Sequence, residues 1–192
     1  RLDGQPAQHT PAAVRFTGGV GAQHKGCHAR KEEIPPALQQ LTGSHHDFGK
    51  QRQVAAKVRQ YGPGHVFFPR DTHFDNYMDT QEGRNLPVPH CIKGTPGWEI
   101  HPELEALRKT DAIDKLTFGS SELPTALAKE ENIESITFVG LCTDICVISN
   151  VMITKAFFPI TVDAKGCAGV TPQSHKNALE AMKMCQITIV NE

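Results

Sequence analysis

From residue 54 onward, the hydrophobic positions form two kinds of segment. Continuous apolar runs predict buried strands, and apolar residues spaced three or four apart predict helices. Runs of this kind that alternate with helices are typical of a parallel sheet covered on both faces, so we predict one doubly wound α/β domain. The predicted strands are 65–68, 136–141, 160–164 and 187–190, and the predicted helices are 54–61, 123–131, about 143–157 and 172–184.

Residues 1–53 lack such a pattern. Their six branched aliphatic residues are never adjacent, and glycine and histidine are frequent. This composition predicts a loosely ordered segment with one short helix at 37–41. We therefore divide the chain into an atypical N-terminal segment, 1–53, and a folded domain, 54–192.

The composition excludes several classes of partner. The 192 residues hold 20 Lys and Arg against 21 Asp and Glu, so no charge excess favours nucleic acid or an anionic membrane. No apolar run reaches the roughly 20 residues that span a bilayer, and the first residues do not resemble a signal peptide. With six cysteines and no secretion signal, we expect reduced thiols and a cytoplasmic protein.

A candidate nucleophile follows the strand 136–141. Cys146 lies in the first turn of the next helix, for which Thr143 or Asp144 is the predicted N-cap, and the free N–H groups there should lower the pKa of its thiol. The same N–H groups could bind an oxyanion. A small buried hydrophobic residue, or a zinc pair with Cys142, are the alternatives.

A nucleophilic cysteine needs a partner that handles protons, and Lys115 is a candidate. It lies among apolar residues, where a lysine is either functional or a surface group whose stem covers apolar side chains. Taken alone, its context favours the surface alternative.

A candidate metal site follows the strand 65–68. Asp71 and His73 are two residues apart in extended chain and can face one ion, while His90 and Glu82 in the following loop can complete the set. Mixed imidazole and carboxylate donors suit Zn²⁺, Fe²⁺ or Mn²⁺ better than Ca²⁺. An ordinary polar loop is the alternative, and two further carboxylates are assigned to solvent: Asp75 and Asp79.

Taken together, these segments are far more specific than any one of them. The string FPRDTH at 68–73, LPVPHCIKGTPG at 86–97, Lys115 and GLCTDICV at 140–147 occur in this order. The order resembles the nicotinamidase branch of the isochorismatase-like cysteine hydrolases, over roughly residues 54–192. The resemblance implies a three-layer α/β/α sandwich with a mainly parallel central sheet.

The resemblance also implies a role for each candidate. Cys146 and Lys115 would be two members of an Asp-Lys-Cys triad, and the backbone N–H groups of Cys142 and Cys146 would form the oxyanion hole, after a cis peptide bond at residues 141–142. Phe118 would belong to an aromatic wall for the substrate ring. One divalent ion, Zn²⁺ or alternatively Fe²⁺ or Mn²⁺, would bind to four residues: Asp71, His73, His90 and Glu82.

The implied reaction is hydrolysis of nicotinamide to nicotinate and ammonia through a Cys146 thioester, a step of NAD salvage in pyridine nucleotide biosynthesis. The implied partner is a small amide, and we expect a homo-oligomer that binds neither nucleic acid nor membrane. Another amidase of the family, acting on a carbamoyl or ureido compound, is one alternative. Isochorismatase itself is disfavoured, because it lacks the nucleophilic cysteine.

The chain departs from the family at the first strand, which should end in the triad Asp. Neither Asp3 nor Asp47 follows an apolar run, so this strand is absent, replaced or unreadable within residues 1–53. An altered reading frame upstream of about residue 54 is one hypothesis for the change in composition. Loss of the Asp also motivates a second alternative, a binding protein without turnover.

Overall fold

The computed structural model describes residues 10–16, 48–61 and 65–192. Six parallel strands form one sheet in the order β3-β2-β1-β4-β5-β6. This is the doubly wound order, in which the order of the strands along the sheet reverses between β1 and β4. The strands are β1 (Thr10–Phe16), β2 (Val66–Asp71), β3 (Ala112–Lys115), β4 (Ile133–Leu141), β5 (Ile160–Ala168) and β6 (Thr188–Val190).

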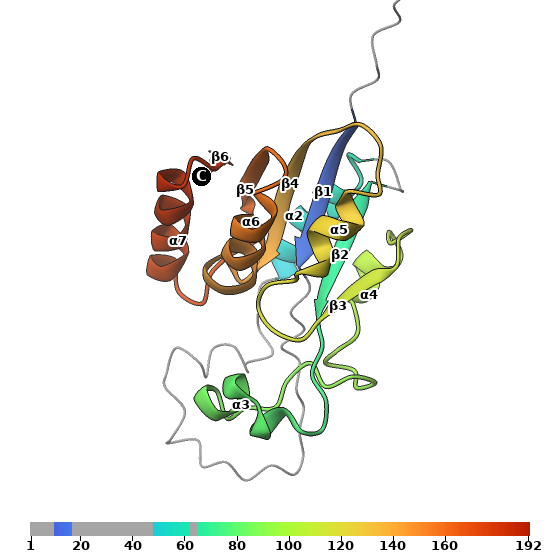
Figure 1. Cartoon of the computed structure of the whole chain (residues 1–192), viewed down its shortest axis with the longest axis vertical. Helices are drawn as coiled ribbons and strands as arrows, with labels where there is room; N and C mark the ends of the chain where they lie inside the picture. The colour runs from blue at the N-terminus through green and yellow to red at the C-terminus, as the bar shows by residue number, and fades with distance from the viewer. Residues whose placement is uncertain (1–9, 17–47, 62–64) are drawn as a thin grey trace, which may run out of the picture.

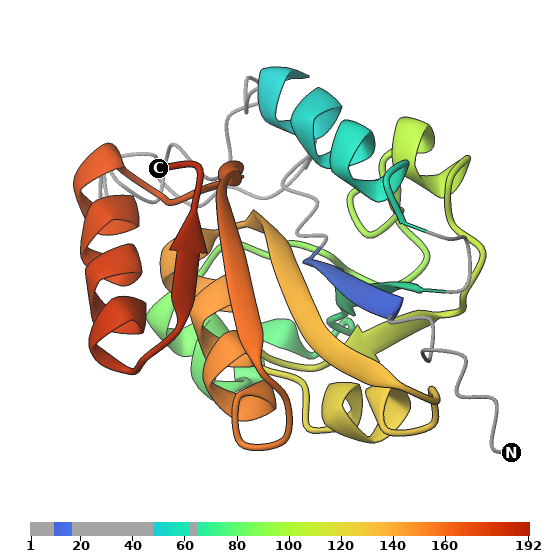
Figure 2. The same cartoon turned by 90° about the horizontal axis from the view of Figure 1, so that it is seen from above.

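Helices cover both faces of the sheet, which confirms the predicted three-layer sandwich (Figure 1, Figure 2). On one face lie α2 (Phe48–Val58) and the short α4 (Pro102–Glu105), and on the other lie α5 (Glu122–Leu127), α6 (Ile148–Thr154) and α7 (Pro172–Met184). Two shorter elements, η2 (Tyr77–Asp79) and α3 (Gln81–Asn85), lie in the long connection from β2 to β3. Within the described residues, no helix has the length and apolar character needed to cross a membrane.

The strand side chains alternate between two cores. From β2, Phe68 packs under α2 and α4, whereas Phe67 packs toward α5, α6 and α7. From β4, Val139 faces the first core and Phe138 the second. Apolar residues on successive positions are therefore buried on both faces, which is why these strands appear in the sequence as unbroken apolar runs.

The element β1 was not predicted. It pairs with β2 and β4 in the middle of the sheet, so a strand forms within the segment in which the sequence analysis found no strand pattern. Its sequence TPAAVRF holds a proline and two alanines, which have little strand preference. This segment is a strand because its backbone pairs with β2 and β4. The possible helix at 37–41 lies outside the described residues.

The predicted helix 143–157 is wrong in its first turn. A single π-helical turn, Thr143–Val147, precedes α6, and neither predicted N-cap residue caps it. The hydroxyl of Thr143 lies 2.7 Å from Nδ1 of His175, while the carboxylate of Asp144 accepts from the N–H of Val170 at 3.1 Å. These two contacts link the π-helical turn to the connection before α7 and to the first residues of α7.

Asn150 joins this turn to the connection between β3 and α5. Its side chain is fully buried, and its Oδ1 accepts from the N–H of Ser120 at 2.8 Å. Its Nδ2 donates to the carbonyls of Phe118 at 2.7 Å and Cys146 at 2.8 Å. One amide therefore satisfies three backbone groups on two segments that meet beside Cys146.

Asn150→Ala should lower the free energy of unfolding by about 3 kcal/mol, because buried backbone groups lose their partners. Urea unfolding followed by circular dichroism measures this. Asn177→Ala is the matched control: this asparagine is exposed on α7 and its Oδ1 accepts from the side chain of Gln173 at 2.8 Å, so its effect should stay within about 0.5 kcal/mol. Equal effects of the two substitutions would contradict the assigned role of Asn150.

Candidate active site

The candidate site lies at the carboxyl end of the sheet, where β2, β3 and β4 end. The arrowheads of β1 and β2 point to the end of the molecule where α3 lies (Figure 1). Asp71 is the last residue of β2, Lys115 is the last of β3, and Cys146 follows β4 after five residues. The three residues therefore lie at the same end of the sheet, because parallel strands have their carboxyl ends on one side.

Lys115 connects the Asp71 carboxylate to the Cys146 sulfur. Asp71 and Lys115 occupy paired positions on neighbouring strands, and the Lys115 Nζ lies 3.0 Å from Oδ1 of Asp71. The same Nζ lies 3.6 Å from Sγ of Cys146 and donates to the carbonyl of Thr117 at 3.1 Å. Lys115 is only 3% exposed, so the surface alternative is wrong.

Burial alone would lower the pKa of Lys115, but the charges of Cys146 and Asp71 raise it above its usual value. Burial also opposes ionisation of Asp71, and its contacts with His73 and Lys115 outweigh this and lower its pKa. The pair is therefore an ammonium and a carboxylate in a buried setting.

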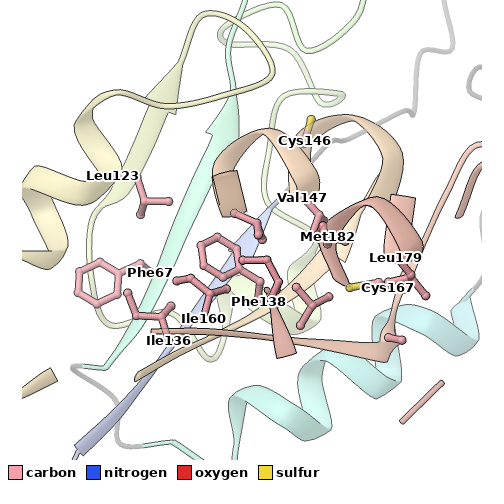
Figure 3. Close-up of a cluster of buried hydrophobic side chains, with 14 of the residues drawn as sticks. Phe67, Leu123, Ile136, Phe138, Cys146, Val147, Ile160, Cys167, Leu179 and Met182 are labelled. Atoms are coloured by element: carbon pink, nitrogen blue, oxygen red, sulfur yellow. The ribbon is translucent and has the colours of Figure 1, made fainter. Parts of the chain in front are cut away.

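Cys146 has a high pKa rather than the predicted low one. Burial raises it to about 11, against the opposing effects of Lys115 and the N–H of Cys142. The prediction rested on the helix terminus alone and did not include the loss of solvation. Figure 3 shows the Cys146 sulfur at the edge of the second core, pointing away from Phe67 and Phe138. Burial likewise raises the pKa of Cys142, to about 12.

Four side chains could hold a metal ion. One donor atom from each of the four lies within 4.8 Å of all the others, and the residues are Asp71, His73, Glu82 and His90. Nε2 of His73 lies 3.5 Å from Oδ2 of Asp71 and 3.4 Å from Oε1 of Glu82. Nε2 of His90 lies 3.7 Å and 3.5 Å from the same two oxygens.

The donors fit a cation because they are buried without hydrogen-bond partners. Nε2 of His73 and both carboxylate oxygens of Glu82 have none, and such groups are costly unless an ion satisfies them. Burial would lower the pKa of His73, but the carboxylates of Asp71 and Glu82 raise it to about 9. An imidazole must be neutral to bind a metal, so a proton and a cation compete for this position.

The surrounding contacts orient these ligands. Nδ1 of His90 lies 2.9 Å from the carbonyl of Val88, which leaves Nε2 facing the other donors. The backbone of His73 pairs with the segment after His90, since its N–H donates to Cys91 and its carbonyl accepts from Lys93. The two histidines are thus brought together by a short bridge between distant segments.

A second group of contacts supports Thr72, which lies between the ligands Asp71 and His73. The Trp98 indole N–H donates to its hydroxyl at 2.9 Å, and the guanidinium of Arg70 lies 3.5 Å from the Trp98 ring centroid. Arg70 also pairs with Asp114 at 2.8 Å. The sequence analysis missed these residues, because nothing in their local pattern marks them as supports of a site.

The remaining expectations have mixed outcomes. The peptide bond between Leu141 and Cys142 is cis, as the resemblance implied, and Asp75 and Asp79 are exposed as predicted. Phe118 is 38% exposed on the connection after β3, and its contact with a substrate stays a prediction. Within Thr10–Phe16 there is no carboxylate to serve as the triad Asp. Asp3 and Asp47 lie outside the described residues.

Comparisons with known proteins agree with this fold. The sequence profile of the Isochorismatase domain matches residues 46–192. The chain is 26% identical over 151 residues to a nicotinamidase/pyrazinamidase of Mycobacterium tuberculosis, covering 66% of this chain and 76% of that protein.

Two solved structures share the fold. The nicotinamidase/pyrazinamidase of Bacillus subtilis has a TM-score of 0.75 at 20% identity, over 95% of this chain and 100% of the other. The pyrazinamidase of Pyrococcus horikoshii in complex with zinc has a TM-score of 0.64 at 18% identity, over 95% and 99% of the two chains. Since the domain profile covers most of its length, the chain belongs to the isochorismatase family.

Proposed function

We propose that this protein is a metal-containing cysteine amidohydrolase that converts nicotinamide to nicotinate and ammonia. One observation carries the proposal: the Lys115 Nζ touches both the Cys146 sulfur and the Asp71 carboxylate, so a thiol and a set of metal donors share one site. The similarity to a nicotinamidase/pyrazinamidase supports a hydrolase of amide C–N bonds. Nicotinate from this reaction would enter NAD salvage.

The ion would be held by Asp71, His73, Glu82 and His90, and when bound it supplies a positive charge that orients the ring nitrogen of the substrate. Zinc is the first candidate, since nitrogen and carboxylate donors suit it and a relative of the same fold was solved with zinc. Fe²⁺ and Mn²⁺ bind similar donor sets. Metal identity is thus part of the proposal.

In the first step, the Cys146 sulfur attacks the amide carbon, a C–S bond forms, and the C–N bond breaks. The thiol proton leaves with the nitrogen as ammonia. Backbone N–H groups of Cys142 and Cys146 hold the developing oxyanion, and the Lys115 ammonium stabilises the sulfur as an anion. Water then cleaves the thioester to release nicotinate and restore the thiol. In the described residues, the carboxylate that meets Lys115 is Asp71.

Two alternatives remain in play. A carbamoyl or ureido amidase of the same family is disfavoured by the complete set of metal donors, which suits a substrate with a ring nitrogen. A binding protein without turnover is favoured by one specific observation: Thr10–Phe16 ends without the family's Asp. Calorimetry with nicotinamide, combined with an ammonia assay, separates the binding protein from the hydrolase, because binding without ammonia release selects the binding protein.

Cys146→Ala should lower ammonia release from nicotinamide by at least about 10⁴-fold, because it removes the sulfur that is proposed to form the thioester. A coupled ammonia assay with nicotinamide and with carbamoyl compounds measures this. Cys185→Ala removes an exposed cysteine and should leave the rate unchanged. Turnover that survives Cys146→Ala would remove Cys146 from the mechanism.

Alkylation of Cys146 by iodoacetamide should increase with pH up to about 11, where its thiol titrates. Because the Lys115 ammonium lowers this pKa, Lys115→Met should raise it and slow alkylation at every lower pH. Peptide mass spectrometry separates Cys146 from the other cysteines. Lys109→Met, an exposed lysine, serves as control, and equal or faster labelling of Lys115→Met would contradict the contact.

The wild-type protein should bind about one zinc ion per chain, and His90→Ala should lose most of it, because one of four donors is removed. Metal analysis after dialysis gives the stoichiometry. His65→Ala changes a histidine before β2, outside the donor group, and should retain the ion. Full retention by His90→Ala would show that the ion binds elsewhere.

A further inference from the structure

Tyr77 is the one inward-facing aromatic side chain of the connection between His73 and His90. It is 1% exposed, whereas Phe74 and Met78 in the same connection are 50% and 44% exposed. Counted from His73 to His90, this connection carries three of the four candidate metal donors, and Tyr77 is its one buried apolar or aromatic side chain between the two histidines. A loop of this composition has no core of its own to fix those donors, unless a residue such as Tyr77 supplies one.

The Tyr77 ring touches both histidine ligands. Its centroid lies 4.8 Å from that of His73 and 5.1 Å from that of His90, and the two imidazoles are 4.9 Å apart. The interplanar angles are 59° and 78° for the two tyrosine contacts, which are tilted and edge-to-face arrangements. Aromatic pairs favour such geometry, so the ring restricts rotation of both imidazoles.

The backbone and hydroxyl of Tyr77 hold the third ligand. Its carbonyl accepts from the hydroxyl of Thr80 at 2.6 Å, and this hydroxyl accepts from the N–H of Gly83 at 2.9 Å, at the start of the helix that carries Glu82. A Cβ on Gly83 would lie 2.0 Å from the Tyr77 carbonyl oxygen, so the helix packs directly on this residue. The Tyr77 hydroxyl donates to the Leu86 carbonyl at 2.9 Å.

We infer that Tyr77 is a positioning residue that holds His73, His90 and Glu82 in the arrangement that binds a divalent cation. The inference rests on the metal site of the proposed function. Without the ring, binding an ion would have to order two imidazoles and the 16 residues between them at the same time, and that entropy would be lost from the affinity. Residues that orient metal ligands change affinity by about 10–100-fold when they are removed.

The test is zinc affinity by chelator competition, with the Co²⁺ absorption spectrum as a record of ligand geometry. Tyr77→Leu should weaken zinc binding by about tenfold or more and change the cobalt spectrum. Tyr77→Phe keeps the ring and loses only the hydrogen bond to Leu86. Its zinc affinity should therefore stay within about threefold of wild type, and its cobalt spectrum should be unchanged. Phe138→Leu, the same kind of truncation in the buried core, should lower Tm and leave metal affinity and spectrum unchanged.

Gly83→Ala provides a second variant if Tyr77→Leu does not fold. The added methyl pushes the helix of Glu82 away from Tyr77 while the ring stays in place, and zinc affinity should again fall. Wild-type affinity and spectrum in Tyr77→Leu, or in Gly83→Ala, would overturn the inference. So would an equal loss in Phe138→Leu. If the wild-type protein binds no zinc, the proposed metal site is wrong. If it binds zinc and the variants bind zinc equally well, the role of Tyr77 is wrong and the metal site stands.

Discussion

The buried contact between Lys115 and Asp71 is the interaction on which the site depends. A lysine and an aspartate in a nearly solvent-free position are costly unless they meet each other. Their paired positions on β3 and β2 make that meeting a consequence of strand register. The same register places the ammonium against the Cys146 sulfur. A shift of one residue would move Lys115 to the other face and separate the thiol from the metal donors.

Asp71 belongs to both halves of the site. Its Oδ1 faces Lys115, and its Oδ2 faces the two histidines. One carboxylate therefore links the candidate metal donors to Lys115, which in turn contacts the Cys146 sulfur. The high pKa of Cys146 in the substrate-free protein fits this arrangement, because a buried thiol stays protonated and unreactive until other charges or contacts favour its anion.

The end of β1 lies between β2 and β4, where the order of the strands along the sheet reverses. The resemblance to the family implies an acid-base carboxylate at this strand end. In this chain Thr10–Phe16 has none, while the lysine, the thiol and all four donors are present. The described residues thus hold the candidate nucleophile and the candidate metal donors, but β1 supplies no carboxylate for proton transfer.

Local patterns in the sequence predicted β2, β4, β5 and α7, because their apolar spacing is strong, and the same sequence singled out Cys146 and four candidate metal donors. Three features became visible in the fold: β1 forms, Lys115 is buried, and Asn150 and Tyr77 contact the segments that carry the site. The physical reason is the same in each case. Burial, pKa and strand pairing depend on neighbours far apart in the chain, and no local pattern records what those neighbours will be.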